Sequence, residues 1–217
     1  MTNRTTRSIT TLLVLMALVI PAAAQARKPA GLLHGKVQRV QPRGMPKNFW
    51  LPATTIKGRQ YVRTFRVTSK EGLKRISDPK NSFRWFQGDG QYGEAFYLFR
   101  SSRDARAFAK CEKSRGAGNR NVIAEIWLPR DKLDQVSKKK VTKEMDWGMQ
   151  RGRSDPAYSN LRDARNGNHL LFGKWAPTPY TSEPFYDRMN GAKQIGVVQR
   201  GMPSILNEAI IVPAKRQ

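Results

Sequence analysis

Hydrophobic and polar residues alternate most regularly over residues 61–68 and 121–128. In the first segment Tyr61, Phe65 and Val67 fall on one face, because successive side chains of a strand point to opposite sides. In the second segment four aliphatic residues occupy alternate positions before Pro129. Both segments are rich in residues that favour extended structure, so the pattern predicts two β-strands.

A helical spacing of apolar residues follows the first strand and returns further along the chain. Residues 70–76 follow Ser69, and residues 103–113 follow Ser101 and Ser102; serine is a residue type that caps helix N-termini. The weaker signals predict strands at 95–99, 185–189, 194–199 and 204–212, an apolar segment at 170–172, and helical segments at 131–136 and 158–166.

The order of these elements predicts an α+β fold with a mixed or antiparallel sheet and short flanking helices. Residues 27–60 contain four prolines and many basic residues, so we expect an extended basic N-terminal arm whose end is held to the core by Phe49 and Trp50. Residues 61–217 then form a single domain, as the length of the chain favours.

The first 26 residues have the organisation of a cleavable signal peptide. Arg4 and Arg7 precede an apolar run of about 12 residues, which is shorter than the roughly 20 that cross a bilayer. Small residues follow at Ala24 and Ala26. We therefore expect a secreted or periplasmic protein, with a retained membrane anchor as the alternative and no later membrane-spanning segment.

The chain carries 40 Lys and Arg against 16 Asp and Glu, a formal net charge of +24. Such a charge attracts polyanions and speeds encounters with them. The candidates are nucleic acid, anionic lipid and cell-envelope polymer, and a well-solvated basic surface with no specific partner gives the same composition. Charge alone does not choose among these.

Cysteine and histidine are too few for the common metal sites. Cys111 is the single cysteine, which excludes an internal disulfide and a cysteine-based zinc site. The two histidines, His34 and His169, are too far apart in sequence for a paired-histidine motif. We expect no metal ion.

Three segments in order carry a resemblance to a known family. They are Arg63-Thr64-Phe65-Arg66-Val67-Thr68, then Gly93-Glu94-Ala95-Phe96-Tyr97-Leu98-Phe99 with Asp104-Ala105-Arg106-Ala107-Phe108-Ala109, and Asn207-Glu208-Ala209-Ile210-Ile211-Val212. Together they resemble the ADP-ribosyltransferase superfamily, which includes diphtheria-type toxins and the poly(ADP-ribose) polymerases. The resemblance spans residues 61–212 and lies in the order and spacing of the segments.

The resemblance implies a split β-sheet fold and an NAD-dependent mono-ADP-ribosyltransferase, an enzyme of the glycosyltransferase class. Arg66 would hold the nicotinamide ribose, Tyr97 would stack on the nicotinamide, and Glu208 would be the catalytic carboxylate. Ser101 lies near the position of a serine triplet in arginine-specific members and joins the cofactor-binding set. An exported member would act as a toxin or effector on DNA, RNA or a protein acceptor, as a monomer, and an acidic inhibitor or immunity protein would suit its charge.

These residue types suit the chemistry independently of the family. Cleavage of the nicotinamide–ribose bond develops oxocarbenium character, which a carboxylate stabilises, as in glycosidases. An aromatic ring stacks on nicotinamide, and an arginine binds pyrophosphate or ribose. Each residue also has an ordinary interpretation: Arg66 as a surface residue, Tyr97 as a core aromatic and Glu208 as an ion-pair partner.

The main alternative is a cationic secreted nucleic-acid-binding protein or ribonuclease without NAD activity. Basic residues and scattered aromatics, which stack on bases, support binding. A ribonuclease is less favoured because acid–base catalysis usually employs histidine. A Ser101–His169 hydrolase pair lacks the glycine-flanked turn that presents a nucleophilic serine.

Overall fold

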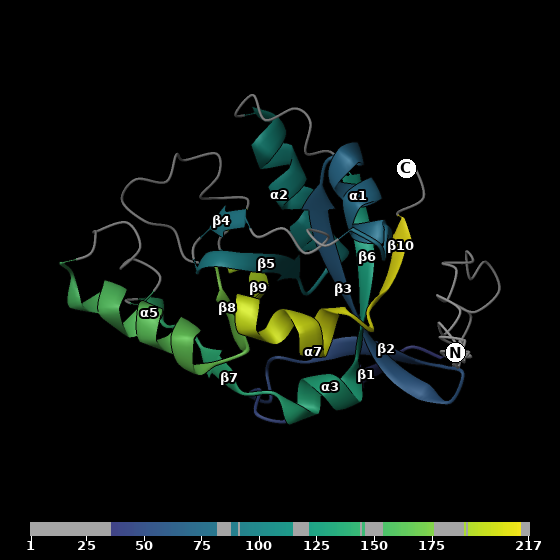
Figure 1. Ribbon diagram of the computed structural model, residues 1–217, viewed down its shortest axis with the longest axis horizontal. Coiled ribbons are helices and arrows are strands. Elements are labelled where there is room, and N and C mark those ends of the chain that lie inside the picture. Colours follow the sequence, from purple (N-terminus) through teal and green to yellow (C-terminus); the bar gives the residue numbers. More distant parts are fainter. Residues whose placement is uncertain are drawn as a thin grey trace, which may run out of the picture.

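The computed structural model describes residues 36–81, 88–90, 92–114, 122–143, 145, 154–175, 189 and 191–213 (Figure 1). The predicted α+β fold is confirmed, with a ten-stranded mixed sheet and short helices. The strands are β1 (Gln38–Val40), β2 (Leu51–Ile56), β3 (Arg59–Thr68), β4 (Gly88–Gly90), β5 (Gly93–Phe99), β6 (Val122–Pro129), β7 (Lys138–Lys140), β8 (Leu170–Lys174), β9 (Lys193–Val197) and β10 (Ile210–Pro213). The helices are α1 (Lys70–Ser77), α2 (Ser102–Ser114), α3 (Arg130–Gln135), α5 (Pro156–Gly167), η1 (Gln199–Gly201) and α7 (Met202–Leu206).

β3 is the strand around which the sheet divides. One edge of β3 pairs with β6 over residues 61–68, and β6 pairs in turn with β10. The other edge is shared, because β2 pairs with its first residues and β5 meets it at Phe65, opposite Phe99. The ends of β2 and β5 therefore lie next to each other where they leave β3.

The second half of the sheet continues from β5 through β9 and β8 to β7. These pairings are antiparallel except that of β7 with β8, which is parallel. β4 and β5 form a hairpin in which Gly90 lies opposite Gly93. Gly93 has a φ of 73°, which favours glycine, and an added Cβ would lie 2.6 Å from the guanidinium of Arg165. The turn into β5 therefore requires glycine.

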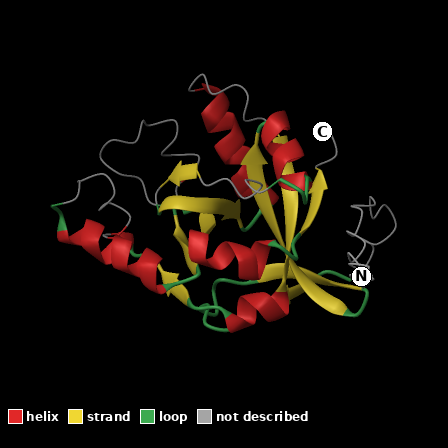
Figure 2. Cartoon of the chain, viewed as in Figure 1, coloured by secondary structure: helices red, strands yellow, loops and turns green. Residues whose placement is uncertain are grey.

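Helices cover both faces of the sheet (Figure 2). Buried residues of α1, α3 and α7 pack on the face that includes Val62, Leu98 and Ile195. On the opposite face α2 covers Phe65 and Phe99, and α5 covers a third group of buried residues on β5 and β8. Several of these side chains have no exposed surface, so the fold has a substantial core.

The capping predictions for the first two helices are confirmed. The Ser69 hydroxyl accepts a hydrogen bond from the amide of Gly72 at 3.0 Å, and the Ser101 hydroxyl accepts one from the amide of Asp104 at 3.1 Å. These bonds satisfy amides that have no partner within the helix. Ser101 thus has a structural role at the start of α2.

Residues 36–60, which the composition predicts to be an extended arm, are part of the folded domain. β2 is a strand of the sheet, and its Leu51 and Ala53 are 0% and 1% exposed. The prolines bend the chain before it: the carbonyls of Pro42 and Pro46 accept turn hydrogen bonds at 3.1 and 2.8 Å. The prediction that Phe49 holds this segment is confirmed, because its ring packs on Phe172 at 5.1 Å.

The strand predicted at 204–212 is wrong in its first half. Residues Met202–Leu206 form α7, with Pro203 in the first turn, where a missing amide hydrogen costs nothing. Met202, Ile205 and Leu206 are buried at helical spacing, and β10 begins only at Ile210. The predicted signal peptide lies outside the described residues, as does the strand predicted at 185–189 except for Met189.

No helix in the described part of the chain is both long enough and apolar enough to span a membrane.

Candidate functional site

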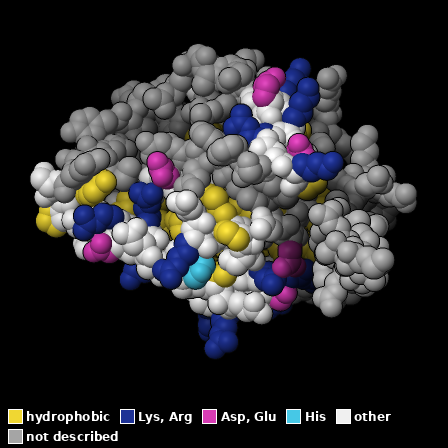
Figure 3. Space-filling view, in the orientation of Figure 1, with side chains coloured by type: hydrophobic (Ala, Val, Ile, Leu, Met, Phe, Trp, Pro, Cys, Tyr) yellow, Lys and Arg dark blue, Asp and Glu magenta, His cyan; other side chains and the backbone are white. Residues whose placement is uncertain are grey.

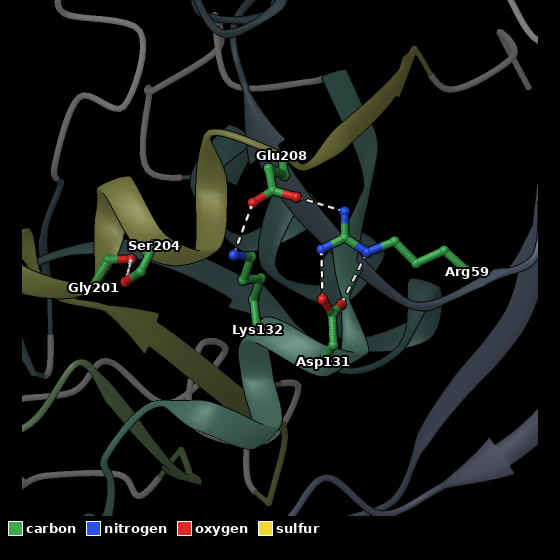
Figure 4. Close-up of polar contacts among 6 residues, drawn as sticks. All are labelled: Arg59, Asp131, Lys132, Gly201, Ser204 and Glu208. Atoms are coloured by element: carbon green, nitrogen blue, oxygen red, sulfur yellow. Dashed lines mark hydrogen bonds and ion pairs between the residues drawn. The ribbon is translucent and has the colours of Figure 1, made fainter.

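Glu208 lies in the short link between α7 and β10, and its carboxylate faces two cations (Figure 4). One oxygen accepts a hydrogen bond from Arg59 at 2.5 Å, and the other forms an ion pair with Lys132 at 3.1 Å. These contacts lower the pKa of Glu208, the hydrogen bond from Arg59 most of all. The carboxylate is therefore held ionised at the surface, where 43% of its side chain is exposed.

Arg59 connects this carboxylate to a second one. Its guanidinium donates two hydrogen bonds to Asp131, at 3.0 and 2.7 Å, in addition to the bond with Glu208. The bonds raise the pKa of Arg59 and lower that of Asp131. The network joins the start of β3, the first turn of α3 and the link before β10. In the structure the network connects three segments that are far apart in the sequence.

Arg66 and Tyr97 lie on neighbouring strands, but their side chains are on opposite faces of the sheet: Arg66 is on the face of Phe96, and Tyr97 packs on the other face. The Arg66 guanidinium donates to the backbone carbonyl of Tyr97 at 3.0 Å and stacks on Phe96 at 3.9 Å. The Tyr97 hydroxyl donates to the carbonyl of Gly93 at 2.6 Å and accepts from the amide of Tyr92 at 2.7 Å. Both side chains are thus engaged in holding the β4–β5 hairpin and β5 against β3.

Glu208 does not join them. Its partner Arg59 begins β3, and Arg66 lies seven residues further along the same strand. At about 3.3 Å per residue this separates the two arginine backbones by about 23 Å. The structure therefore joins Arg66 only to the backbone of Tyr97, and it holds Glu208 near the opposite end of β3.

The remaining hydrolase candidates are also separated. Ser101 caps α2, whereas His169 bonds through Nδ1 to the hydroxyl of Ser137 at 2.7 Å. Ser137 also receives the His169 amide on its carbonyl, so this pair closes the turn that leads into β8. Burial and the nearby Arg200 lower the pKa of His169.

A row of cations that the sequence analysis missed crosses three neighbouring strands. Arg100 directly follows β5, Lys193 begins β9 and Lys174 ends β8. Lys174 lies opposite Lys193 in the antiparallel register, and the amide of Arg100 donates to the carbonyl of Lys193 at 3.0 Å. Residues opposite each other in a sheet project from the same face, so the three side chains stand side by side. We call these three residues the cation row.

The electrostatics of the cation row are unfavourable within the described protein. Like charges directly opposite each other destabilise a sheet. Burial lowers the pKa of Lys193, and the charges of Arg100 and Lys174 lower it further, whereas only Asp104 acts in the other direction. Among the residues that the structure describes, none of the three forms an ion pair. The row is a concentration of positive charge that Asp104 offsets only in part.

Trp50 lies at one end of the cation row, where the ends of β2 and β5 meet. The Arg100 guanidinium lies 4.6 Å from the centre of a Trp50 ring, and that of Arg39 lies 4.3 Å from it. Lys193 extends over the neighbouring Phe49 at 5.7 Å and donates to the carbonyl of Asn48. A half-buried indole thus contacts two cations, and a third, Lys193, lies over the residue next to it.

Some basic side chains elsewhere lie beside carboxylates. On the face drawn in Figure 3, Lys and Arg side chains lie in small groups, with acidic side chains among them. Arg63, for example, lies 3.9 Å from Glu125, and Arg130 lies 3.4 Å from Asp134. No side chain of the cation row forms an ion pair among the described residues, and the carboxylate nearest to it, that of Asp104, accepts a hydrogen bond from the backbone amide of Lys193 at 3.4 Å.

The sequence contains little that identifies this row. Each member stands at the end of a short apolar segment, where a charged residue is common, and the three are widely separated along the chain. Their meeting depends on the register of β5, β9 and β8. The one sequence signal for this row is that a basic residue stands at the end of several strands that are predicted to lie next to each other.

No family model matches the chain, and no curated protein or solved structure matches it either. The ADP-ribosyltransferase resemblance therefore stays a prediction that rests on the residues that carry it.

Proposed function

We propose that this protein binds nucleic acid, and that the cation row with Trp50 and Arg39 forms the contact. The observation that carries the proposal is the alignment of Arg100, Lys193 and Lys174 on one face of three adjacent strands. Phosphate groups would relieve the mutual repulsion of these side chains. The excess of 24 positive charges over the whole chain would steer a polyanion toward the protein.

Trp50 favours nucleic acid over other polyanions. An anionic polymer without aromatic rings can neutralise the cations, but it gains nothing from an indole. Nucleic-acid-binding surfaces combine positive charge along the backbone with aromatic side chains on which bases stack. The half-buried Trp50 and the cations adjoin, so one strand of nucleic acid can contact both.

The NAD-dependent transfer reaction is the other prediction for this chain. It requires Glu208 near the ribose that Arg66 and Tyr97 would hold, whereas Glu208 is bound to Arg59 and Lys132. Arg59, which binds Glu208, and Arg66 lie about 23 Å apart along β3. We therefore base the proposed function on the cation row.

The experiment is a comparison of nucleic-acid binding by two double variants. Lys174→Gln with Lys193→Gln removes two cations of the row, and Lys74→Gln with Lys110→Gln removes two exposed lysines from α1 and α2. Binding of a fluorescent 12-nucleotide thymidine oligonucleotide is measured by anisotropy. Each lost phosphate contact lowers the salt slope for single strands by about 0.7, so the row variant should bind about 25-fold more weakly at 0.1 M salt than wild type.

The control variant removes the same net charge and is expected to bind within about threefold of wild type, because exposed charges far from the ligand are screened. Equal weakening in the two variants would show that binding follows net charge and would contradict the proposed site. No binding by wild type would contradict the proposed function.

A further inference from the structure

The stacking arrangement at Trp50 is unusual in having two cations on one indole. The guanidinium centres of Arg39 and Arg100 lie 4.3 and 4.6 Å from the ring centre. Each contact is favourable alone, but the two positive charges repel each other across a shared aromatic group. Among the described residues neither arginine forms an ion pair that would reduce this repulsion.

The two arginines are held to different extents. Arg100 is half-buried, and its backbone is fixed by the hydrogen bond to β9. Arg39 is exposed and lies on β1, a three-residue strand at the margin of the sheet that pairs only with β2 among the described strands. Of the two stacking partners, Arg39 is therefore the one that can leave the indole without disturbing the core.

A nucleobase is a suitable replacement for the Arg39 guanidinium. Both are flat groups that stack on an indole face, and stacking of a base does not depend on its sequence because every base has a π-face. The displaced guanidinium is a planar donor fork, which is suited to binding phosphate through two hydrogen bonds. The exchange therefore replaces a cation–cation repulsion by one base stack and one additional phosphate contact.

We propose that the site takes a single-stranded nucleic acid, one base of which stacks on Trp50 in place of Arg39 while the cation row binds the adjoining phosphates. The inference rests on the proposed function and adds the class of ligand. Duplex ends aside, a double helix offers no free base face, because each base is already stacked and paired. The site therefore prefers single strands to duplexes of equal charge.

The geometry supports a continuous contact from base to phosphates. Arg100 belongs both to the stack on Trp50 and to the cation row, so the base position and the first phosphate position adjoin. Lys193 lies over Phe49, the residue before Trp50, at 5.7 Å. The row then extends to Lys174 across two strand spacings, about 10 Å in all. A strand that stacks on Trp50 is thereby led along the row.

The test uses three probes and two variants of the purified protein. The probes are a 12-nucleotide thymidine oligonucleotide, an abasic oligonucleotide of the same length, and a hairpin duplex with the same number of phosphates. The abasic probe keeps the charge and lacks the bases. Trp50→Leu removes the aromatic face, and Trp50→Phe keeps one, so the pair separates stacking from packing.

Wild type is expected to bind the thymidine oligonucleotide more tightly than the abasic strand or the hairpin. Trp50→Leu should weaken binding of the thymidine oligonucleotide by about 5- to 150-fold, the range for loss of one base–aromatic stack, and leave the abasic strand almost unchanged. Trp50→Phe should keep most of the affinity, and thermal unfolding confirms that both variants are folded.

Three results would overturn the inference. Equal affinity of wild type for the thymidine and abasic strands would show that no base is bound, while leaving electrostatic binding intact. Equal weakening of both strands by Trp50→Leu would assign Trp50 a structural role. Failure of all three probes to bind would overturn the proposed function as well.

Discussion

The network around Glu208 permits a prediction that separates its structural role from a catalytic one. Glu208→Gln keeps the shape of the side chain and removes its charge. In the unsubstituted protein the carboxylate contacts Arg59 at 2.5 Å and Lys132 at 3.1 Å, so the substitution weakens two ion pairs at once. Its consequences for stability and for NAD chemistry can be measured on the same variant.

The expected loss of stability is small because the network is exposed. Glu208 is 43% exposed and each of its two partners 33%. Surface ion pairs contribute about 0.2–1 kcal/mol each, and linked pairs lie in the upper part of that range. We therefore expect Glu208→Gln to lower the free energy of unfolding by about 1 kcal/mol. For a chain of this length that corresponds to a melting temperature lower by about 2–4 °C.

The pH dependence identifies the cause. The pKa of Glu208 is lower in the folded protein than its ordinary value of 4.5, so its ionised form stabilises the fold above that value. This contribution declines as the pH falls through the lowered pKa. The difference in stability between wild type and Glu208→Gln should therefore be complete at pH 7 and decrease as the pH falls below 4.5.

The assay is urea unfolding followed by circular dichroism at pH 7 and pH 3, with Glu94→Gln as the control. Glu94 is exposed on β5 and forms no ion pair among the described residues. A difference that is as large at pH 3 as at pH 7, or an equal effect of the control, would refute the electrostatic explanation. Nicotinamide release from NAD by wild type that collapses in Glu208→Gln would instead support the transferase prediction.

Three further predictions concern stability. Arg59→Ala, measured by urea unfolding, should destabilise the fold more than Glu208→Gln, because both Asp131 and Glu208 lose their partner. Ser101→Ala removes the cap of α2 and should cost about 1 kcal/mol in the same assay, without changing oligonucleotide affinity. Gly93→Ala should lower the melting temperature by several degrees, because the positive φ costs about 1–2 kcal/mol and the added Cβ meets Arg165.

Local patterns in the sequence predicted the elements that depend on local physical chemistry. The strand around Phe65 is evident from its alternation, and the serine caps identify the starts of α1 and α2. The sequence predicts a strand over residues 204–212, where the structure begins with a helix at Met202–Leu206, because five residues are too few to distinguish the two periods. Pro203 in its first turn was the signal that favoured a helix.

Long-range pairing was the part that the sequence did not predict. The prolines of residues 36–60 predict an extended arm, but Pro42 and Pro46 lie in turns between β1 and β2, Pro52 lies within β2, and Leu51 enters the core. Glu208 was predicted from its place before an apolar strand, and its actual partners, Arg59 and Lys132, come from segments that only the fold brings near. The cation row likewise depends on strand register.

The salt dependence of oligonucleotide binding tests the central claim most directly. Arg39 and the three residues of the cation row are four cations. For a single strand they imply that log Kobs falls linearly with the logarithm of the salt concentration, with a slope whose magnitude is at least about 2.8. Lys174→Gln with Lys193→Gln should reduce the magnitude of that slope by about 1.4, and Lys74→Gln with Lys110→Gln should leave it unchanged. A slope that is the same in wild type and in both variants would contradict the account.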